Sequence, residues 1–191
     1  ILKKGTIVDS TIISAPSSTK NTEKKRDPDA HQVKKGNTWH FGYKAHIGVD
    51  RDSGLVHTVE ATAANVHDAT ETSKLLTGDE DEVYGDSGYL GAEKRGDAII
   101  RNKAGRKIKY RINRRPSQVK KLSKSGQYAA KKAEHAKSSV RAKVEHAFGV
   151  VKKQLRFRKT RYRGLEKQRA KFNIMFALAN LILADRPCLA A

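Results

Sequence analysis

The chain has 191 residues with 40 lysines and arginines against 20 acids, a net charge of +20, and a single cysteine, Cys188. This length allows one domain with a sizeable core, and one cysteine excludes a disulfide-stapled scaffold and fits a reducing, cytoplasmic setting. The longest apolar run falls short of the roughly 18 residues that a membrane-spanning helix needs, so we expect no membrane partner.

Charge is unevenly distributed along the chain. Residues 50–93 hold 2 lysines and arginines and 11 acids, a net of −9, whereas residues 94–169 hold 27 and 4, a net of +23. A segment this basic indicates a polyanionic partner, with nucleic acid favoured. Ribosomal-type RNA binding or an acidic protein partner would give the same signal, so charge alone leaves these alternatives open.

The first predicted element is a buried strand over residues 4–13, a run rich in β-branched residues with Asp9 in its middle. Burying an ionised carboxylate costs several kcal/mol unless a cation or several donors meet it. Asp9 is therefore expected to be paired or to bind metal. Taken alone, the stretch is also compatible with a satisfied structural aspartate.

Residues 14–37 are polar and contain Pro16 and Pro28, which predicts a long surface loop. Its lysines make it either a flexible linker or an arm that contacts DNA. Residues 39–49 alternate apolar and polar side chains, and residues 55–62 are rich in strand formers. These two segments predict an antiparallel hairpin.

A second acid, Asp86, follows in the middle of the chain. Asp68 is predicted to be the N-cap of a helix that follows it and runs to Leu76, and residues 83–89 predict a short strand that ends in small residues. Asp86 thus lies where a strand runs into a glycine-lined turn, a place where a ligand can approach the backbone closely.

The remaining residues predict a short helix over 92–98, a fifth strand over 107–112, and helices over 140–159 and 165–183. Residues 116–137 are rich in lysine and serine and favour no particular structure.

A third acid, Glu145, lies on the helix predicted over residues 140–159. At about 100° per residue, Glu145 and Lys152 project about 40° and about 20° away from Arg141, so the three polar groups form one stripe. For an isolated pair, a surface Arg–Glu ion pair is the simpler interpretation.

This order of elements is that of the ribonuclease-H-like α/β fold, in which a mixed five-stranded sheet is flanked by helices. The first and fourth strands are neighbours there, so we expect Asp9, Asp86 and Glu145 to converge. Three such carboxylates repel one another unless divalent cations hold them ionised. Oxygen ligands favour magnesium or manganese over zinc, and a pair of ions ~3.5–4 Å apart is suited to phosphodiester chemistry.

Five motifs occur together at these positions: residues 5–13, 43–46, 65–68 and 85–89, and the spacing Arg141-x3-Glu145-x6-Lys152. Together they resemble the DDE transposases of bacterial insertion sequences, in particular the IS-four/IS-five superfamily. The resemblance implies that Asp9, Asp86 and Glu145 are catalytic and bind two Mg²⁺ ions, for which Mn²⁺ can substitute. It implies metal-dependent cleavage and strand transfer at transposon ends.

The same resemblance implies that Arg141 and Lys152 hold phosphates of double-stranded DNA and that the chain acts as a homodimer on DNA. Further candidate phosphate ligands are Arg156, Arg158, Lys159, Arg161 and Arg163. Three histidines near the motifs, His46, His67 and His146, are expected to pack or hydrogen-bond rather than to act in catalysis. One departure is Ser138, which stands where the family signature has a tyrosine.

We expect one catalytic domain over residues 1–184, without the N-terminal DNA-binding region of relatives, and a tail over 185–191. Two alternatives remain: a non-catalytic basic nucleic-acid-binding protein, and a ribonuclease-H-like nuclease without strand transfer. Residues 85–88 also match the nucleophile turn of trypsin-like proteases. That class is disfavoured because Tyr89 replaces the next glycine and the chain lacks a disulfide framework.

Overall fold

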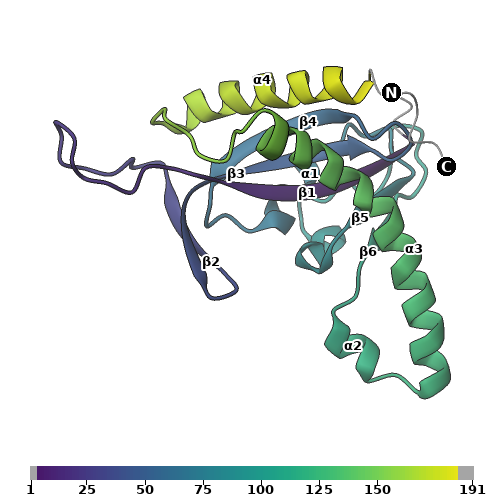
Figure 1. Ribbon diagram of the computed structural model, residues 1–191. Coiled ribbons are helices and arrows are strands. Elements are labelled where there is room, and N and C mark those ends of the chain that lie inside the picture. Colours follow the sequence, from purple (N-terminus) through teal and green to yellow (C-terminus); the bar gives the residue numbers. More distant parts are fainter. Residues whose placement is uncertain (1–3, 185–191) are drawn as a thin grey trace.

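A computed structural model describes residues 4–184 of the chain. These residues form a six-stranded mixed sheet with helices on its faces (Figure 1). The strands are β1 (Gly5–Ser14), β2 (His31–Lys35), β3 (Thr38–Asp50), β4 (Val56–Ala63), β5 (Glu82–Gly85) and β6 (Lys109–Ile112). The helices are α1 (Thr72–Leu75), α2 (Pro116–Lys120), α3 (Lys124–Gly149) and α4 (Leu165–Ala184). Short 3₁₀ turns η1 (Asp68–Thr70), η2 (Ser87–Tyr89) and η3 (Ala92–Lys94) and a π-helical turn, η4 (Val150–Gln154), complete the set.

The strand order is β2-β3-β1-β5-β6, with β4 also paired to β3. β1 runs antiparallel to β3 and parallel to β5, and β5 runs parallel to β6. This mixed sheet with flanking helices confirms the predicted ribonuclease-H-like α/β fold. The tail predicted over residues 185–191, with Cys188, lies outside the described residues.

The sheet contains a strand, β2, that the sequence did not predict. β2 lies inside the segment 14–37, which was expected to be a loop throughout, and it pairs with the first residues of β3 through a turn at Gly36. Only Val33 of this strand is apolar and none of its residues is buried, so no hydrophobic pattern marked it. β2 is therefore held by its backbone hydrogen bonds to β3 and not by burial of an apolar face.

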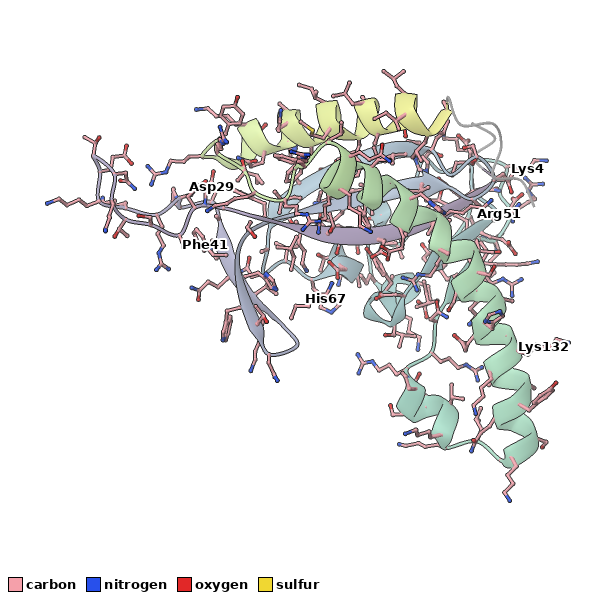
Figure 2. All side chains as sticks on the ribbon, in the orientation of Figure 1. Lys4, Asp29, Phe41, Arg51, His67 and Lys132 are labelled. Atoms are coloured by element: carbon pink, nitrogen blue, oxygen red, sulfur yellow. The ribbon has the colours of Figure 1, made fainter. Side chains whose placement is uncertain are left out.

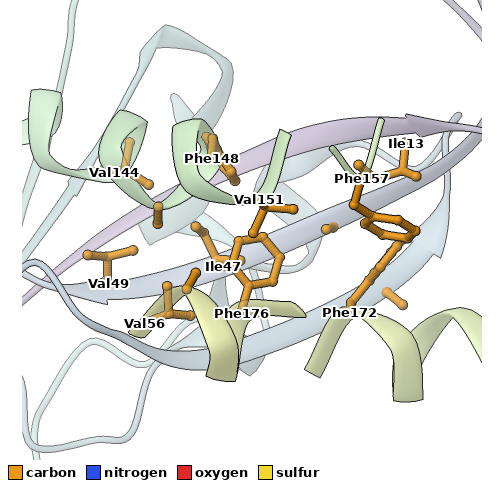
Figure 3. Packing of buried hydrophobic residues seen from close by; sticks show 14 of the residues in the cluster. Ile13, Ile47, Val49, Val56, Val144, Phe148, Val151, Phe157, Phe172 and Phe176 are labelled. Atoms are coloured by element: carbon orange, nitrogen blue, oxygen red, sulfur yellow. The ribbon is translucent and has the colours of Figure 1, made fainter. Parts of the chain in front are cut away.

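One face of the sheet carries the main core, beneath α3 and α4 (Figure 3). Alternate residues of β3, such as Ile47 and Val49, point to this face as predicted. Phe148 from α3 meets Phe176 from α4 edge to face, with ring centroids 6.2 Å apart. Trp39 was expected to join the same face but is 63% exposed. It lies at the start of β3, in the part that pairs with β2.

A smaller core fills the opposite face, where Val8 and Val83 contact Leu75 and Tyr89. The helix predicted between Asp68 and Leu76 is split here into η1 and α1. Its N-cap is His67, whose ring nitrogen accepts the Ala69 N–H, and not Asp68 as predicted. The Asp68 carboxylate instead accepts hydrogen bonds from Ser10 and Lys44.

The two long helices differ in how well their bounds were predicted. α4 matches its prediction almost residue for residue, because it buries a continuous apolar face. α3 begins at Lys124 rather than at residue 140, capped by Ser123, and α2 precedes it. Figure 1 shows that α2 and the first half of α3 project away from the sheet, so little apolar periodicity marked them. None of the described helices is apolar over a stretch that would cross a membrane.

Candidate active site

Asp9 and Asp86 are brought to the same level of the sheet by the pairing of β1 with β5. These strands are parallel, and Ile7 lies opposite Tyr84. Each aspartate comes two residues after its member of this pair, and both line the same cleft. Two acids 77 positions apart in the chain therefore meet because their strands are neighbours.

The cleft has a volume of about 480 Å³ and is bounded by β1, the turn after β5, and the end of α3. Glu145 and Arg141 line it from α3 and Lys152 lines it from η4, so the polar stripe predicted over residues 140–159 faces the two aspartates. The other residues of its lining are Ser10, Thr11, Lys35, Phe148, Gly149, Lys153 and Arg158. Three carboxylates thus share one cleft with several cations.

Asp9 is the most perturbed of the three carboxylates. Burial raises its pKa to about 6, against the Ser10 N–H and the Arg141 guanidinium, which lower it, while the charges of Asp86 and Glu145 raise it further. Asp9 Oδ1 accepts the Ser10 N–H at 2.7 Å, and Oδ2 lies 3.3 Å from Arg141 Nη2. A buried acid in this setting is stabilised by added positive charge.

Asp86 is fixed by the turn that follows β5. Its Oδ1 accepts the Gly88 N–H at 2.7 Å, so Asp86 caps η2. A Cβ at position 88 would lie only 2.9 Å from that same oxygen, which explains the glycine there.

Arg141 is held by a polar chain that includes Ser138, the position at which the sequence departs from the family signature. Asn113 Nδ2 donates to Ser138 Oγ at 3.3 Å, and Asn113 Oδ1 accepts from Arg141 Nη1 at 3.5 Å. The buried Arg141 Nε has no hydrogen-bond partner among residues 4–184. Arg141 therefore keeps an unused donor while pairing with Asp9.

Lys152 is partly buried in the cleft wall. Its pKa is lowered by burial and then by the neighbouring charges of Lys35 and Arg158. Arg158 Nε donates to the Lys152 carbonyl at 3.1 Å and also lines the cleft. This wall is a concentration of positive charge that an anion would relieve.

The remaining predicted basic residues lie outside the cleft lining. Arg163 pairs with Glu23 at 2.9 Å and also donates to the Lys25 carbonyl, so it anchors the segment before β2. The others, Arg156, Lys159 and Arg161, are exposed.

The three predicted histidines are also outside the cleft lining. His46 is fully buried, and burial lowers its pKa to about 4, which keeps it neutral at physiological pH. His67 caps η1, and His146 is exposed on α3.

A second network lies directly behind Asp9, on the other face of β1. Asp68 Oδ1 accepts from Ser10 Oγ at 2.8 Å and from Lys44 Nζ at 2.9 Å, and it lies 3.7 Å from His46 Nδ1. Lys44 Nζ also donates to the Val66 carbonyl at 2.7 Å. The motifs 43–46 and 65–68 are therefore joined in space, a contact that sequence spacing does not reveal.

Two further features connect this network to the cleft. Asp68 Oδ2 would lie 3.9 Å from a Cβ on Gly88, so Asp68 approaches the turn that holds Asp86. The Tyr89 hydroxyl is buried and has no hydrogen-bond partner in the described part of the chain. Burial raises its pKa well above its usual value, and the charges of Asp9, Asp68 and Asp86 raise it further, so it stays protonated.

Among residues 4–184, no three carboxylate, histidine or cysteine side chains are grouped closely enough to hold a metal ion together. Asp9 and Asp86 instead use nearby N–H groups and Arg141 as partners. The donor chemistry nevertheless suits a hard cation, because the cleft offers carboxylate oxygens without histidine or cysteine. The pKa of Asp9 is raised first by burial and then by the charges of Asp86 and Glu145, so a cation beside this carboxylate would favour its ionised form.

Residues 2–181 match the family model described as the transposase DDE domain, which covers most of the chain. No solved structure matches the chain.

Proposed function

The chain belongs to the transposase DDE domain family, and we propose that it cleaves DNA and transfers strands at transposon ends, with Asp9, Asp86 and Glu145 as its catalytic acids. The observation that supports this most is the shared cleft. It brings together three acids from β1, the β5 turn and α3, with Arg141 and Lys152 beside them. Assignment to the IS-four/IS-five superfamily stays a prediction.

Asp9, Asp86 and Glu145 are the residues that would hold divalent cations, Mg²⁺ or Mn²⁺, as an expected pair. When bound, these ions supply Lewis-acid activation of water or a 3′-hydroxyl and neutralise charge on the phosphodiester. Glu145 is exposed on α3, so its side chain has freedom to turn toward the two aspartates.

The basic wall of the cleft supplies phosphate binding in this proposal. Arg141, Lys152 and Arg158 all line the cleft. These cations place the DNA backbone against the acids and offset charge that develops in the transition state. Binding of double-stranded DNA as a homodimer is part of the proposal and rests on family membership.

The test is nicking of supercoiled plasmid DNA by the purified chain with Mg²⁺ or Mn²⁺. We expect cation-dependent nicking that falls to background in Asp86→Ala and Glu145→Ala, while DNA binding is kept. The matched control is Asp79→Ala, an exposed acid outside the cleft, which should nick like the parent chain.

The same assay separates the two alternatives. DNA binding with no cation-dependent nicking in any variant would indicate a non-catalytic binder. Nicking without joining of a labelled 3′-hydroxyl oligonucleotide to the plasmid would indicate a nuclease that lacks strand transfer.

A further inference from the structure

A hairpin tip formed by residues 34–39, between β2 and β3, projects from the body of the molecule (Figure 1). All six residues are exposed, and Trp39, the only tryptophan of the chain, is 63% exposed. Lys34 lies directly opposite Trp39 in the strand register. The tip therefore presents an exposed aromatic face beside ammonium groups, which is the surface chemistry of a stacking platform for a base.

The hairpin tip is continuous with the catalytic cleft. Lys35 lines the same cleft as Asp9 and Asp86, and its charge contributes to lowering the pKa of Lys152. A strand that lies along the cleft wall therefore meets Lys35, at the edge of the tip that carries Trp39.

Charge identifies the partner. Residues 30–49 contain no acid, and the tip carries Lys34 and Lys35, so its own surface is positively charged. A polyanion offsets that charge. Aromatic faces flanked by lysines are the usual surface for unpaired nucleotides, because each base offers a face for stacking. In duplex DNA those faces are covered by neighbouring base pairs.

We propose that the hairpin tip binds an unpaired nucleotide of the DNA strand that leaves the catalytic cleft, with the base stacked on Trp39 and its phosphates near Lys34 and Lys35. This inference rests on the proposed function, since it assigns a second contact to the same DNA. It gives the site a preference for DNA ends that are frayed or single-stranded beside the cleaved bond.

The single tryptophan makes the test direct, because fluorescence excited beyond the absorption band of the tyrosines reports on position 39 alone. The probes are a blunt duplex and the same duplex with a short oligothymidine tail. We expect the tailed duplex to quench the fluorescence and to shield it from acrylamide, and the blunt duplex to do neither. Tailed DNA should bind more tightly than blunt DNA.

Substitutions at position 39 then test whether Trp39 causes the difference in affinity between tailed and blunt DNA. Trp39→Ala should remove the affinity gained from the tail, a loss of about 5- to 100-fold, and Trp39→Phe should restore part of it. Blunt-duplex binding should not change in either variant. The matched control is Tyr128→Ala, which removes another exposed aromatic, 77% exposed on α3 and outside the cleft lining.

Three results would overturn the inference: equal quenching by both DNAs, no loss of tail-dependent affinity in Trp39→Ala, or acrylamide shielding that grows with protein concentration in the absence of DNA. The last would show that a second copy covers the tip. Failure of the proposed function is separate, since it would appear as plasmid nicking that is absent or that Asp86→Ala does not affect, whichever DNA quenches the fluorescence.

Discussion

The buried position of Asp9 makes its ionisation a cost to the fold. Burial is the largest cause of its raised pKa of about 6, compared with 3.8 for an ordinary aspartate. An acid whose folded pKa is raised destabilises the fold as pH rises through that range, because the unfolded state ionises first. This penalty is absent below about pH 4 and complete above about pH 7.

Asp9→Asn should therefore stabilise the protein at neutral pH. In chelator, its free energy of unfolding should exceed that of the parent chain by about 2–3 kcal/mol at pH 7 and by close to zero at pH 4. Urea denaturation across this pH range measures the gap. A gap that does not change with pH would contradict the assignment of the buried charge to Asp9.

Asp68 is expected to stabilise the sheet from the side opposite the cleft. Burial alone would raise its pKa, but hydrogen bonds from Lys44 and Ser10 outweigh burial and lower it. Asp68→Asn leaves the mostly buried Lys44 ammonium without its counter-charge, and should lower the free energy of unfolding by about 1–3 kcal/mol.

The control for that variant is Asp52→Asn, which removes an exposed ion pair with Arg51 and should change stability by less than about 1 kcal/mol. Equal losses of unfolding free energy in the two variants would show that the Lys44–Asp68 pair stabilises the fold no more than an exposed ion pair does. The contribution of Asp68 should fade as pH falls below the ordinary range of aspartate, since its folded pKa is depressed.

At the scale of elements, prediction from sequence succeeded where an element buries an apolar face. The alternation over residues 39–49 and the apolar stripe of α4 both marked elements of the main core. β2 and the first half of α3 were missed because they lie at the edge of the fold or beyond it. The three acids were found from their strand and helix contexts, whereas the contact of Lys44 with Asp68 depends on tertiary pairing that no local pattern encodes.

Gly42 shows how closely β1 and β3 approach where both strands bend. A Cβ at this position would overlap the Ile13 carbonyl oxygen and lie 2.9 Å from the Ala15 nitrogen. Gly42→Ala should therefore disturb the register that places Asp9, and lower the free energy of unfolding by about 3 kcal/mol or more. Gly149→Ala is the contrasting variant, because no atom lies within 4 Å of its Cβ and a helical glycine is replaced.

Gly149→Ala should raise stability by about 0.5–1 kcal/mol. Denaturant unfolding of both variants gives the comparison. If both variants lost the same stability, the loss in Gly42→Ala could not be assigned to the close contact with the Ile13 carbonyl oxygen.

At the scale of the whole molecule, the charge pattern predicted a polyanionic partner. Several of the basic residues line the cleft in the structure. Lys152 is the clearest test, since it lies in the cleft wall with Lys35 and Arg158. If it contacts a backbone phosphate, its removal releases about one counterion fewer when DNA binds.

Lys152→Ala should therefore weaken binding to every duplex sequence by a similar factor and reduce the slope of log affinity against log salt by about 0.9. The measurement is DNA binding by fluorescence anisotropy over a series of salt concentrations. Lys103→Ala is the matched control, because Lys103 is exposed, pairs with Asp79 at 3.2 Å and lies outside the cleft lining, so its slope should equal that of the parent chain. A Lys152→Ala slope that also equals the parent value would remove Lys152 from the phosphate contacts. In that case the same measurement on the exposed lysines of the projecting half of α3, among them Lys132 (Figure 2), would test a second path for the DNA.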